Sequence, residues 1–149
     1  MLNLINDREY QLLLNLEDEQ IRLGGRLVLL FFNTYIIDKI LQEKRRTLSE
    51  PVEIYGNLQY SEGKNTEESE SGKKVVIDAM IRFSFLSIDK RNEELKIGDI
   101  VKVPIGKSYQ EFTILKVTPV VKDKEYLDRI MAYDCELQFI SSRKLKNER

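Results

Sequence analysis

Apolar residues alternate with polar ones along much of the second half of the chain, as they do in half-buried β-strands. Within residues 75–89 the apolar face consists of Val75, Ile77, Ala79, Ile81, Phe83 and Phe85. Within residues 130–140 it consists of Tyr133, Cys135, Leu137 and Phe139. Both segments are predicted to be strands that line a core, and the first is long enough to bend and contribute to two sheets.

The stretch between these two strands predicts a β-hairpin. Residues 97–99 (Ile-Gly-Asp) form a turn signal before a first strand at 100–103, and a return strand is expected at about 109–117. Residues 104–107 are predicted to connect the two strands. Gly106 is expected to take the positive φ that glycine adopts without steric cost.

The N-terminal segment is predicted to be an amphipathic helix. Asn6 or Asp7 can cap it, it runs to about Gln20, and Gly24-Gly25 interrupts the chain after it. Its apolar stripe is Tyr10, Leu13, Leu14 and Ile21, and the other side carries most of the charges, namely Arg8, Glu9, Glu17, Asp18 and Glu19. We expect the stripe to pack on the sheet; docking on a partner subunit is the alternative.

Two strands separated by a segment of mixed character are predicted next. The run RLVLLFF at 26–32 predicts a buried strand, and VEIYGNLQY at 52–60 predicts a strand in which Gly56 marks a bulge or a close approach. In between, residues 33–46 carry apolar residues at helical spacing, which predicts a short helix or an irregular arm that closes before Pro51. The apolar residues concerned are Ile36, Ile37, Ile40 and Leu41.

The basic cluster Lys44-Arg45-Arg46 is interpreted as the solvated end of that predicted helix. A salt-sensitive contact to a nucleic acid or to an acidic partner is the alternative.

Residues 61–74 form the one low-complexity stretch. They include no apolar residue, so burial cannot offset the entropy lost on ordering. One interpretation is a floppy hairpin tip, and the other is an insertion loop that orders against a partner or lines a pore. Under the second, the candidate interface or channel residues are Glu62, Lys64, Asn65, Glu67, Glu68, Glu70, Lys73 and Lys74.

Two further polar segments are expected at the surface. Residues 122–128 are a polar excursion before the last strand, and residues 141–149 are a basic tail that we expect to be frayed. Within the tail, Arg143, Lys144 and Lys146 are candidate contacts to a neighbouring protein.

Length and composition fit a single soluble domain. The chain has 149 residues, of which 42% are hydrophobic and 33% charged, which allows a sizeable core. We expect a mainly β fold: a small β-barrel or sandwich of about six strands with one or two peripheral helices. The domain would consist of an N-terminal helix (1–25), a β-barrel core (26–140) and a flexible tail (141–149).

The residues that carry most enzyme chemistry are scarce. The chain has no His and one Cys, which removes the commonest general base and metal ligand and excludes an internal disulfide. Cys135 lies in an alternating strand and is interpreted as a buried structural thiol. Asp78, Asp99, Asp134 and Glu136 are the available carboxylates, but no pattern pairs two of them, and no phosphate-binding or dinucleotide motif occurs. We therefore expect neither catalysis nor a metal or cofactor.

Charge and apolar content bear on the kind of partner. A net charge of −1 argues against a dedicated DNA- or RNA-binding domain. The first residues lack the apolar centre of a signal peptide, and the longest apolar run, residues 27–32, is too short to cross a bilayer. We expect an intracellular or particle-borne protein with no membrane partner.

Aromatic residues leave one binding alternative open. Phe83, Phe85, Phe112 and Phe139 could stack nucleobases, as aromatic residues do on an OB-fold. Their alternation, however, places them toward the core, with little Arg or Lys between them.

Three motifs recur in an order that resembles a known family. They are IRLGGRLVLLFF at 21–32, EPVEIYGN at 50–57 and ELKIGDIVKVPIGKSYQEFTILKV at 94–117. The chain has a strand with Tyr-Gly, followed by Ile-Gly-Asp and then by an aromatic strand that would close a small barrel. This order resembles the neck or head–tail connector proteins of tailed bacteriophages, the class of adaptors, stoppers and head-completion proteins. The resemblance covers about residues 21–140, and Asn57 stands where the family frequently has Glu.

The resemblance implies a structural role in a virion that is assembled in the host cytoplasm. Such proteins form a ring of several copies between portal and tail, and their loops form or gate the channel for packaged DNA. The implied partners are further copies of the chain, a portal or adaptor protein, and tail proteins, with residues 61–74 at the channel or the seam between subunits. A nucleic-acid-binding OB-like β-barrel module and a bacterial scaffolding or adaptor domain unrelated to phage are the alternatives.

Overall fold

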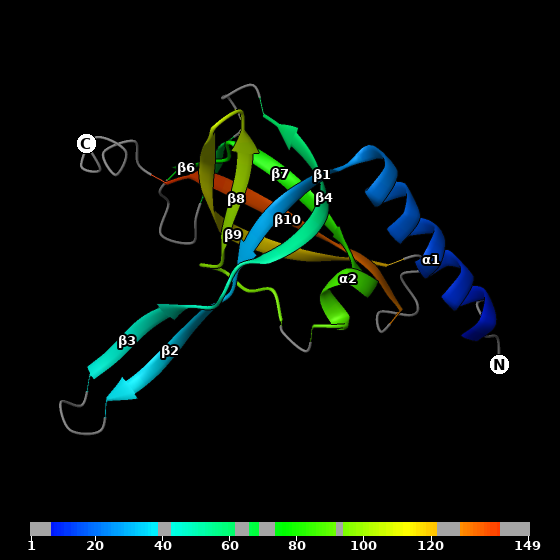
Figure 1. Ribbon diagram of the computed structural model, residues 1–149, viewed down its shortest axis with the longest axis horizontal. Helices are drawn as coiled ribbons and strands as arrows, with labels where there is room; N and C mark the ends of the chain where they lie inside the picture. Colours follow the sequence, from blue (N-terminus) through cyan, green and yellow to red (C-terminus); the bar gives the residue numbers. More distant parts are fainter. Residues whose placement is uncertain are drawn as a thin grey trace.

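Six antiparallel strands close into a barrel, around which the rest of the chain is arranged (Figure 1). The computed structural model describes residues 7–38, 43–61, 66–68, 74–91, 94–121 and 129–140. In order around the barrel, the strands are β1 (Arg26–Phe31), β4 (Val52–Tyr60), β7 (Ala79–Ser84), β10 (Ile130–Phe139), β9 (Ser108–Val121) and β8 (Ile100–Ile105). Pairing of β1 with β8 closes the barrel. The expected mainly β fold with peripheral helices is confirmed.

Two helices and two small hairpins flank the barrel in the described part of the chain. They are α1 (Asp7–Gly24), α2 (Phe85–Asp89), the hairpin of β2 (Asn33–Asp38) with β3 (Glu43–Leu48), and the hairpin of β5 (Thr66–Glu68) with β6 (Lys74–Val76). Figure 1 shows α1 along one side of the barrel, whereas the β2–β3 ribbon leaves the barrel on the other side. We call this ribbon, residues 33–38 and 43–48, the arm.

The barrel core is built from the inward residues of the alternating pattern. Ile77, Ala79, Ile81 and Phe83 are all buried, so the register predicted for this stretch is confirmed. The core also includes Val28, Leu30, Ile54, Val101, Val103, Phe112, Ile114, Cys135 and Leu137. A slip of one residue in any of these strands would turn apolar side chains to water, which is why the alternation fixes the register.

Helix α1 confirms the predicted amphipathic helix, and its stripe packs on the barrel. Leu14 and Ile21 are buried against it. The assignment of Asp18 to the charged outer side was wrong, because this residue is 9% exposed and faces the barrel. The hydroxyl of Ser84 donates a hydrogen bond of 2.5 Å to its carboxylate, which offsets the cost of burying the charge.

The described residues between 33 and 46 lie in strands, so the helix option was wrong; the other option, an arm, is closer, although these residues form a regular ribbon. Residues 33–38 pair with 43–48 in an antiparallel hairpin, in which Tyr35 lies opposite Arg46 and Ile37 opposite Lys44. The stretch from Thr34 to Ile37 consists of β-branched and aromatic residues, which favour strands. The basic cluster therefore lies in strand β3 rather than at a helix end.

The long strand predicted at 75–89 is divided into three parts. Residues 74–76 belong to the small β5–β6 sheet and 79–84 to the barrel, so the predicted contribution to two sheets is confirmed. Phe85 begins helix α2 instead of continuing the strand. The Ser84 hydroxyl accepts the backbone N–H of Ser87 and caps this helix, which overrides the alternation.

The β8–β9 hairpin is confirmed with a tighter connection than expected. Pro104 and Ile105 belong to β8, so only Gly106 and Lys107 form the turn. Gly106 has φ of 57° and Gly98 has φ of 98°, so both occupy the region that favours glycine.

Two of the aromatics expected in the core are not fully buried. Phe85 lies half-buried on α2, and Phe139 is 43% exposed at the end of β10, where its ring stacks on Phe112 at 4.7 Å between centroids. Phe83 and Phe112 are buried as predicted. Phe139 is the last residue of β10 and pairs with the buried Phe112, so it lies at the open end of the core.

Candidate assembly interface

The arm is held at its base by one buried carboxylate. Asp99 is 0% exposed, and its two carboxylate oxygens accept the backbone N–H of Asn33 at 2.8 Å and that of Lys96 at 2.9 Å. The Lys96 ammonium lies 3.3 Å from the same carboxylate. The Asn33 amide in turn donates to the carbonyl of Gly98 at 3.1 Å. Asp99 therefore joins the first residue of the arm to the turn that precedes β8.

A second set of hydrogen bonds holds the return strand at the same place. The N–H of Ser49 donates to the carbonyl of Phe32 at 2.8 Å, and the Ser49 hydroxyl accepts the N–H of Phe32 at 2.9 Å. Both strands of the arm are thus fixed where they leave the barrel.

Beyond this base, β2 and β3 make extensive contacts only with each other among the described elements. An isolated two-stranded hairpin is at best marginally stable in water. The two outer edges of the ribbon also carry backbone groups that no described strand pairs. The arm is therefore the candidate assembly interface among the described elements.

The opposite side of the molecule is organised by α1. The hydroxyl of Tyr10 donates to the carbonyl of Ile130 at 2.6 Å. Gly25 follows the helix at a position where a Cβ atom would lie 2.6 Å from the carbonyl oxygen of Gly56. Gly56 is itself a close approach, because a Cβ there would lie 2.5 Å from Cδ1 of Ile81. Of the two options predicted for Gly56, the close approach is the one observed: pairing with β1 ends at Gly56, pairing with β7 begins at Asn57, and neither pairing has a register shift.

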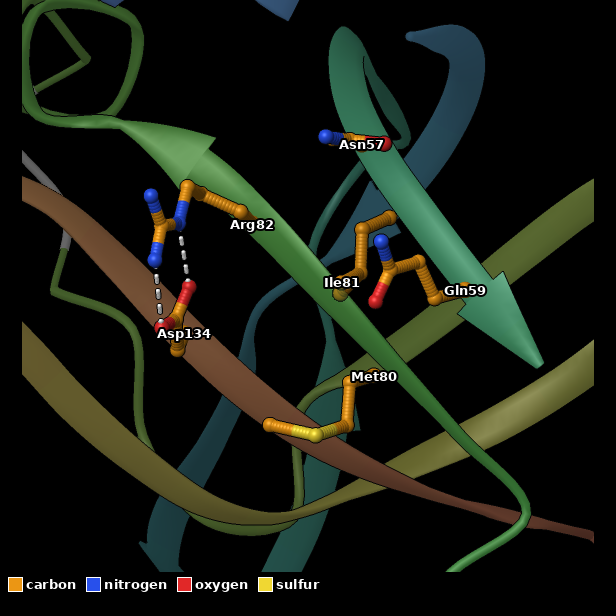
Figure 2. A pocket seen from close by; sticks show the side chains of 6 residues that line it. All are labelled: Asn57, Gln59, Met80, Ile81, Arg82 and Asp134. Atoms are coloured by element: carbon orange, nitrogen blue, oxygen red, sulfur yellow. Dashed lines mark hydrogen bonds and ion pairs between the residues drawn. The ribbon is translucent and has the colours of Figure 1, made fainter. Parts of the chain in front are cut away.

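A hollow of about 260 Å³ lies on the barrel. Figure 2 shows the residues that line it: Asn57, Gln59, Met80, Ile81, Arg82 and Asp134. Arg82 and Asp134 form a bidentate pair at 2.6 and 2.9 Å, and Glu17 of α1 lies 3.5 Å from the same guanidinium. The hydrogen bond to Asp134 raises the pKa of Arg82 above its usual value. The guanidinium is neutralised by these two carboxylates, and its ion pairs join β7 to β10 and to helix α1.

Three of the four carboxylates considered for acid–base work are each bound by a different partner. Asp99 is engaged at the base of the arm, Asp134 by Arg82, and Asp78 accepts the N–H of Phe139 at 2.7 Å. Glu136 lies two residues from Asp134 on the same face of β10, opposite Lys116 of β9. Among the described residues, His, Cys, Asp and Glu form no cluster that could hold a metal ion.

Most of the residues predicted for the interface or channel fall outside the described residues. Glu62, Lys64, Asn65, Glu70 and Lys73 do, as do Arg143, Lys144 and Lys146 of the tail and the polar excursion at 122–128. Glu67, Glu68 and Lys74 lie in the β5–β6 hairpin, where Glu68 is opposite Lys74. The described β5–β6 hairpin makes no extensive contact with the arm. Within the arm, only the basic cluster at 44–46 has an alternative interpretation as a partner contact.

Cys135 is buried in the barrel core, as predicted. Burial raises the pKa of its thiol to about 12. The folded protein thus favours the neutral thiol. The stability that this gives is fully present below the pKa that the thiol has in the unfolded chain, and it is lost as pH rises toward 12.

We expect Cys135 in the folded protein to be unreactive toward a thiol reagent at pH 8. Between pH 8 and 10, the wild type should lose about 1.5–2 kcal/mol more unfolding free energy than Cys135→Ala, since only the thiol of the unfolded wild-type chain ionises there. Urea titrations at both pH values measure the difference. Equal losses in the two proteins would contradict the assignment.

No protein-family model matches the chain, and no curated protein sequence matches it. No helix in the described residues is long and apolar enough to cross a membrane. The interpretation of the arm and of α1 therefore depends on their geometry and chemistry.

Proposed function

We propose that this protein is a structural subunit that forms a ring of several copies in the neck of a tailed bacteriophage virion, between portal and tail. The observation that carries the proposal is the arm: a two-stranded ribbon that is firmly fixed at its base and has no support from described elements of its own chain beyond it. A segment built in this way gains stability when a neighbouring subunit covers it.

The closed barrel supports this role. Within the described residues, its strands leave no free edge, so edge-to-edge growth is blocked at the barrel and confined to the small hairpins. A subunit with a closed body and a defined arm can form an assembly of fixed geometry. The order of the motifs at 21–32, 50–57 and 94–117, which resembles connector proteins, makes the phage neck the favoured setting.

The mass of the assembled species tests the proposal. Native mass spectrometry of the purified chain, alone and with a phage portal ring, is expected to give one discrete multi-copy species on the portal. The matched control replaces residues 34–47 by Asn-Gly, which retains Asn33, Leu48 and the hydrogen bonds at the base. The free energy of unfolding of this variant should lie within about 0.5 kcal/mol of the wild-type value, but the variant should give no ring. A wild-type chain that stays monomeric with the portal overturns the proposal.

The polar loop gives a separate prediction. Ser61 and Asp78 lie side by side, because the N–H of Ser61 donates to the carbonyl of Asp78 at 2.9 Å. Replacing residues 62–76 by Asn-Gly should therefore leave the barrel folded. If the loop lines the channel or the seam, particles carrying this variant should assemble poorly or lose DNA, as measured by the ratio of full to empty particles. Unaltered particles would exclude the loop from the mechanism.

A nucleic-acid-binding module is the second candidate, on one observation. Tyr60, Tyr109 and Phe139 are each between 40 and 50% exposed, and the Tyr60 hydroxyl bonds the side chain of Gln110, so aromatic rings are available outside the core. Stacking of bases on such rings would give binding of single-stranded oligonucleotides that weakens steeply with salt. Fluorescence anisotropy with a labelled single strand, at low and moderate salt, separates the two candidates.

A further inference from the structure

Helix α1 has a second apolar face that is exposed among the described residues. Leu12, Leu16 and Leu23 are 61%, 51% and 81% exposed, although leucine is usually buried. Their separations of four and seven residues place them on one side of the helix. Leu14 and Ile21, which pack on the barrel, occupy the opposite side. We call Leu12, Leu16 and Leu23 the outer helix face.

The arm and α1 have complementary composition. Helix α1 contains five acidic and two basic residues, a net charge of −3, and two of the acidic residues, Glu17 and Asp18, are already paired with arginines. The two strands of the arm contain three basic and two acidic residues, a net charge of +1, together with Tyr35, Ile36 and Ile37. Opposite net charges favour a contact between the helix and the ribbon over a contact between two helices or between two ribbons.

The two surfaces cannot meet within one molecule. Figure 1 shows the arm and α1 leaving the barrel on opposite sides. With six residues in each strand, the arm reaches roughly 20 Å from its base. A contact between the two surfaces must therefore join two copies, and because the surfaces differ, it is head-to-tail and closes into a ring when the rotation between copies permits.

We propose that the arm of one copy packs on the outer helix face of α1 in the next copy. The inference rests on the proposed function, because it names the contact that would build the ring. It assigns the docking surface to Leu12, Leu16 and Leu23 and the occupant to the arm, residues 33–38 and 43–48, of a second copy of this chain. The other possible occupants are α1 of a second copy, and a different protein.

Disulfide capture tests the contact directly. The only native cysteine, Cys135, is buried, so an introduced surface cysteine is the one reactive thiol. One protein carries Leu16→Cys; two others carry Tyr35→Cys or Ile36→Cys, because adjacent positions of a strand face opposite ways and one of them must face the helix. The helix variant is mixed with each arm variant under mild oxidation at millimolar chain concentration, where even weak contacts are populated.

The expected result is a cross-linked pair in the mixture of the helix variant with one arm variant. Tyr109→Cys, at a position 48% exposed on the barrel, is the matched control and should give at least tenfold less product with the same arm variant. A chain carrying both cysteines should give a ladder of multimers. Cross-linking of Leu16→Cys with itself alone would assign α1 as the occupant and overturn the proposal.

The outcome distinguishes this inference from the proposed function. If the wild type forms a ring on the portal but neither mixture cross-links, the ring is built by another contact and the inference is wrong. If a mixture cross-links but no species forms on the portal, the contact exists and the phage neck role is wrong.

Discussion

Replacing Asp99 with alanine is expected to lower the free energy of unfolding by about 3–5 kcal/mol. Its carboxylate is fully buried and accepts the N–H groups of both Asn33 and Lys96. The variant leaves the two N–H donors without their buried acceptor, and the partly exposed Lys96 ammonium without its ion pair. Urea-induced unfolding measures the loss.

The matched control is Asp89→Ala, since Asp89 is exposed at the end of α2. It should change the free energy of unfolding by no more than about 0.5 kcal/mol. Amide hydrogen exchange adds a local readout: Asn33 should lose protection in Asp99→Ala more than residues of β10 do. A loss below about 1 kcal/mol would mean that a water molecule replaces the carboxylate.

Gly25→Ala is expected to destabilise the protein by about 3 kcal/mol, the upper end for overpacking, because the new methyl group meets backbone atoms of Ile21 and Gly56 and neither can rotate away. Helix α1 would have to tilt off the barrel. In a chain of this size, the melting temperature should fall by roughly 6–12 °C. Thermal unfolding followed by circular dichroism measures the shift.

The neighbouring glycine provides the control. A Cβ at Gly24 would meet nothing within 4 Å, and alanine is the better residue in a helix. Gly24→Ala should therefore leave stability unchanged or raise it by up to about 1 kcal/mol. Equal losses at the two positions would show that the close approach of Gly25 to β4 is not what limits substitution.

The barrel strands could be predicted because their signal is local. In residues 77–83, strict alternation gave a buried face that the structure retains. The positive φ of Gly106 also followed from the turn in which it lies. Each of these features depends on residues that are close together in the sequence, and a pattern can represent them.

The arm and its anchor could not be predicted in the same way. Residues 33–38 become a strand because they pair with 43–48, and the charged run from Glu43 to Arg46 has no alternation to announce this. Asp99 was interpreted through its own turn, whereas its contact with Asn33 joins residues far apart in the chain. Likewise, nothing near Asp18 indicates that Ser84 would bond it.

Closure of the barrel between β1 and β8 also sets the order in which the chain can fold. Leu30 pairs with Val101, so β1 and β8 can pair only after most of the barrel has been synthesised. Strands β8, β9 and β10, in contrast, each pair with the next strand along the chain. Contacts so distant in sequence slow folding. The arm belongs to the chain segment that the pairing of β1 with β8 closes into a loop. The entropy lost on closing such a loop varies only with the logarithm of its length. Variants with longer or shorter arms should therefore fold at nearly the same rate, which leaves arm length free to adapt to its partner.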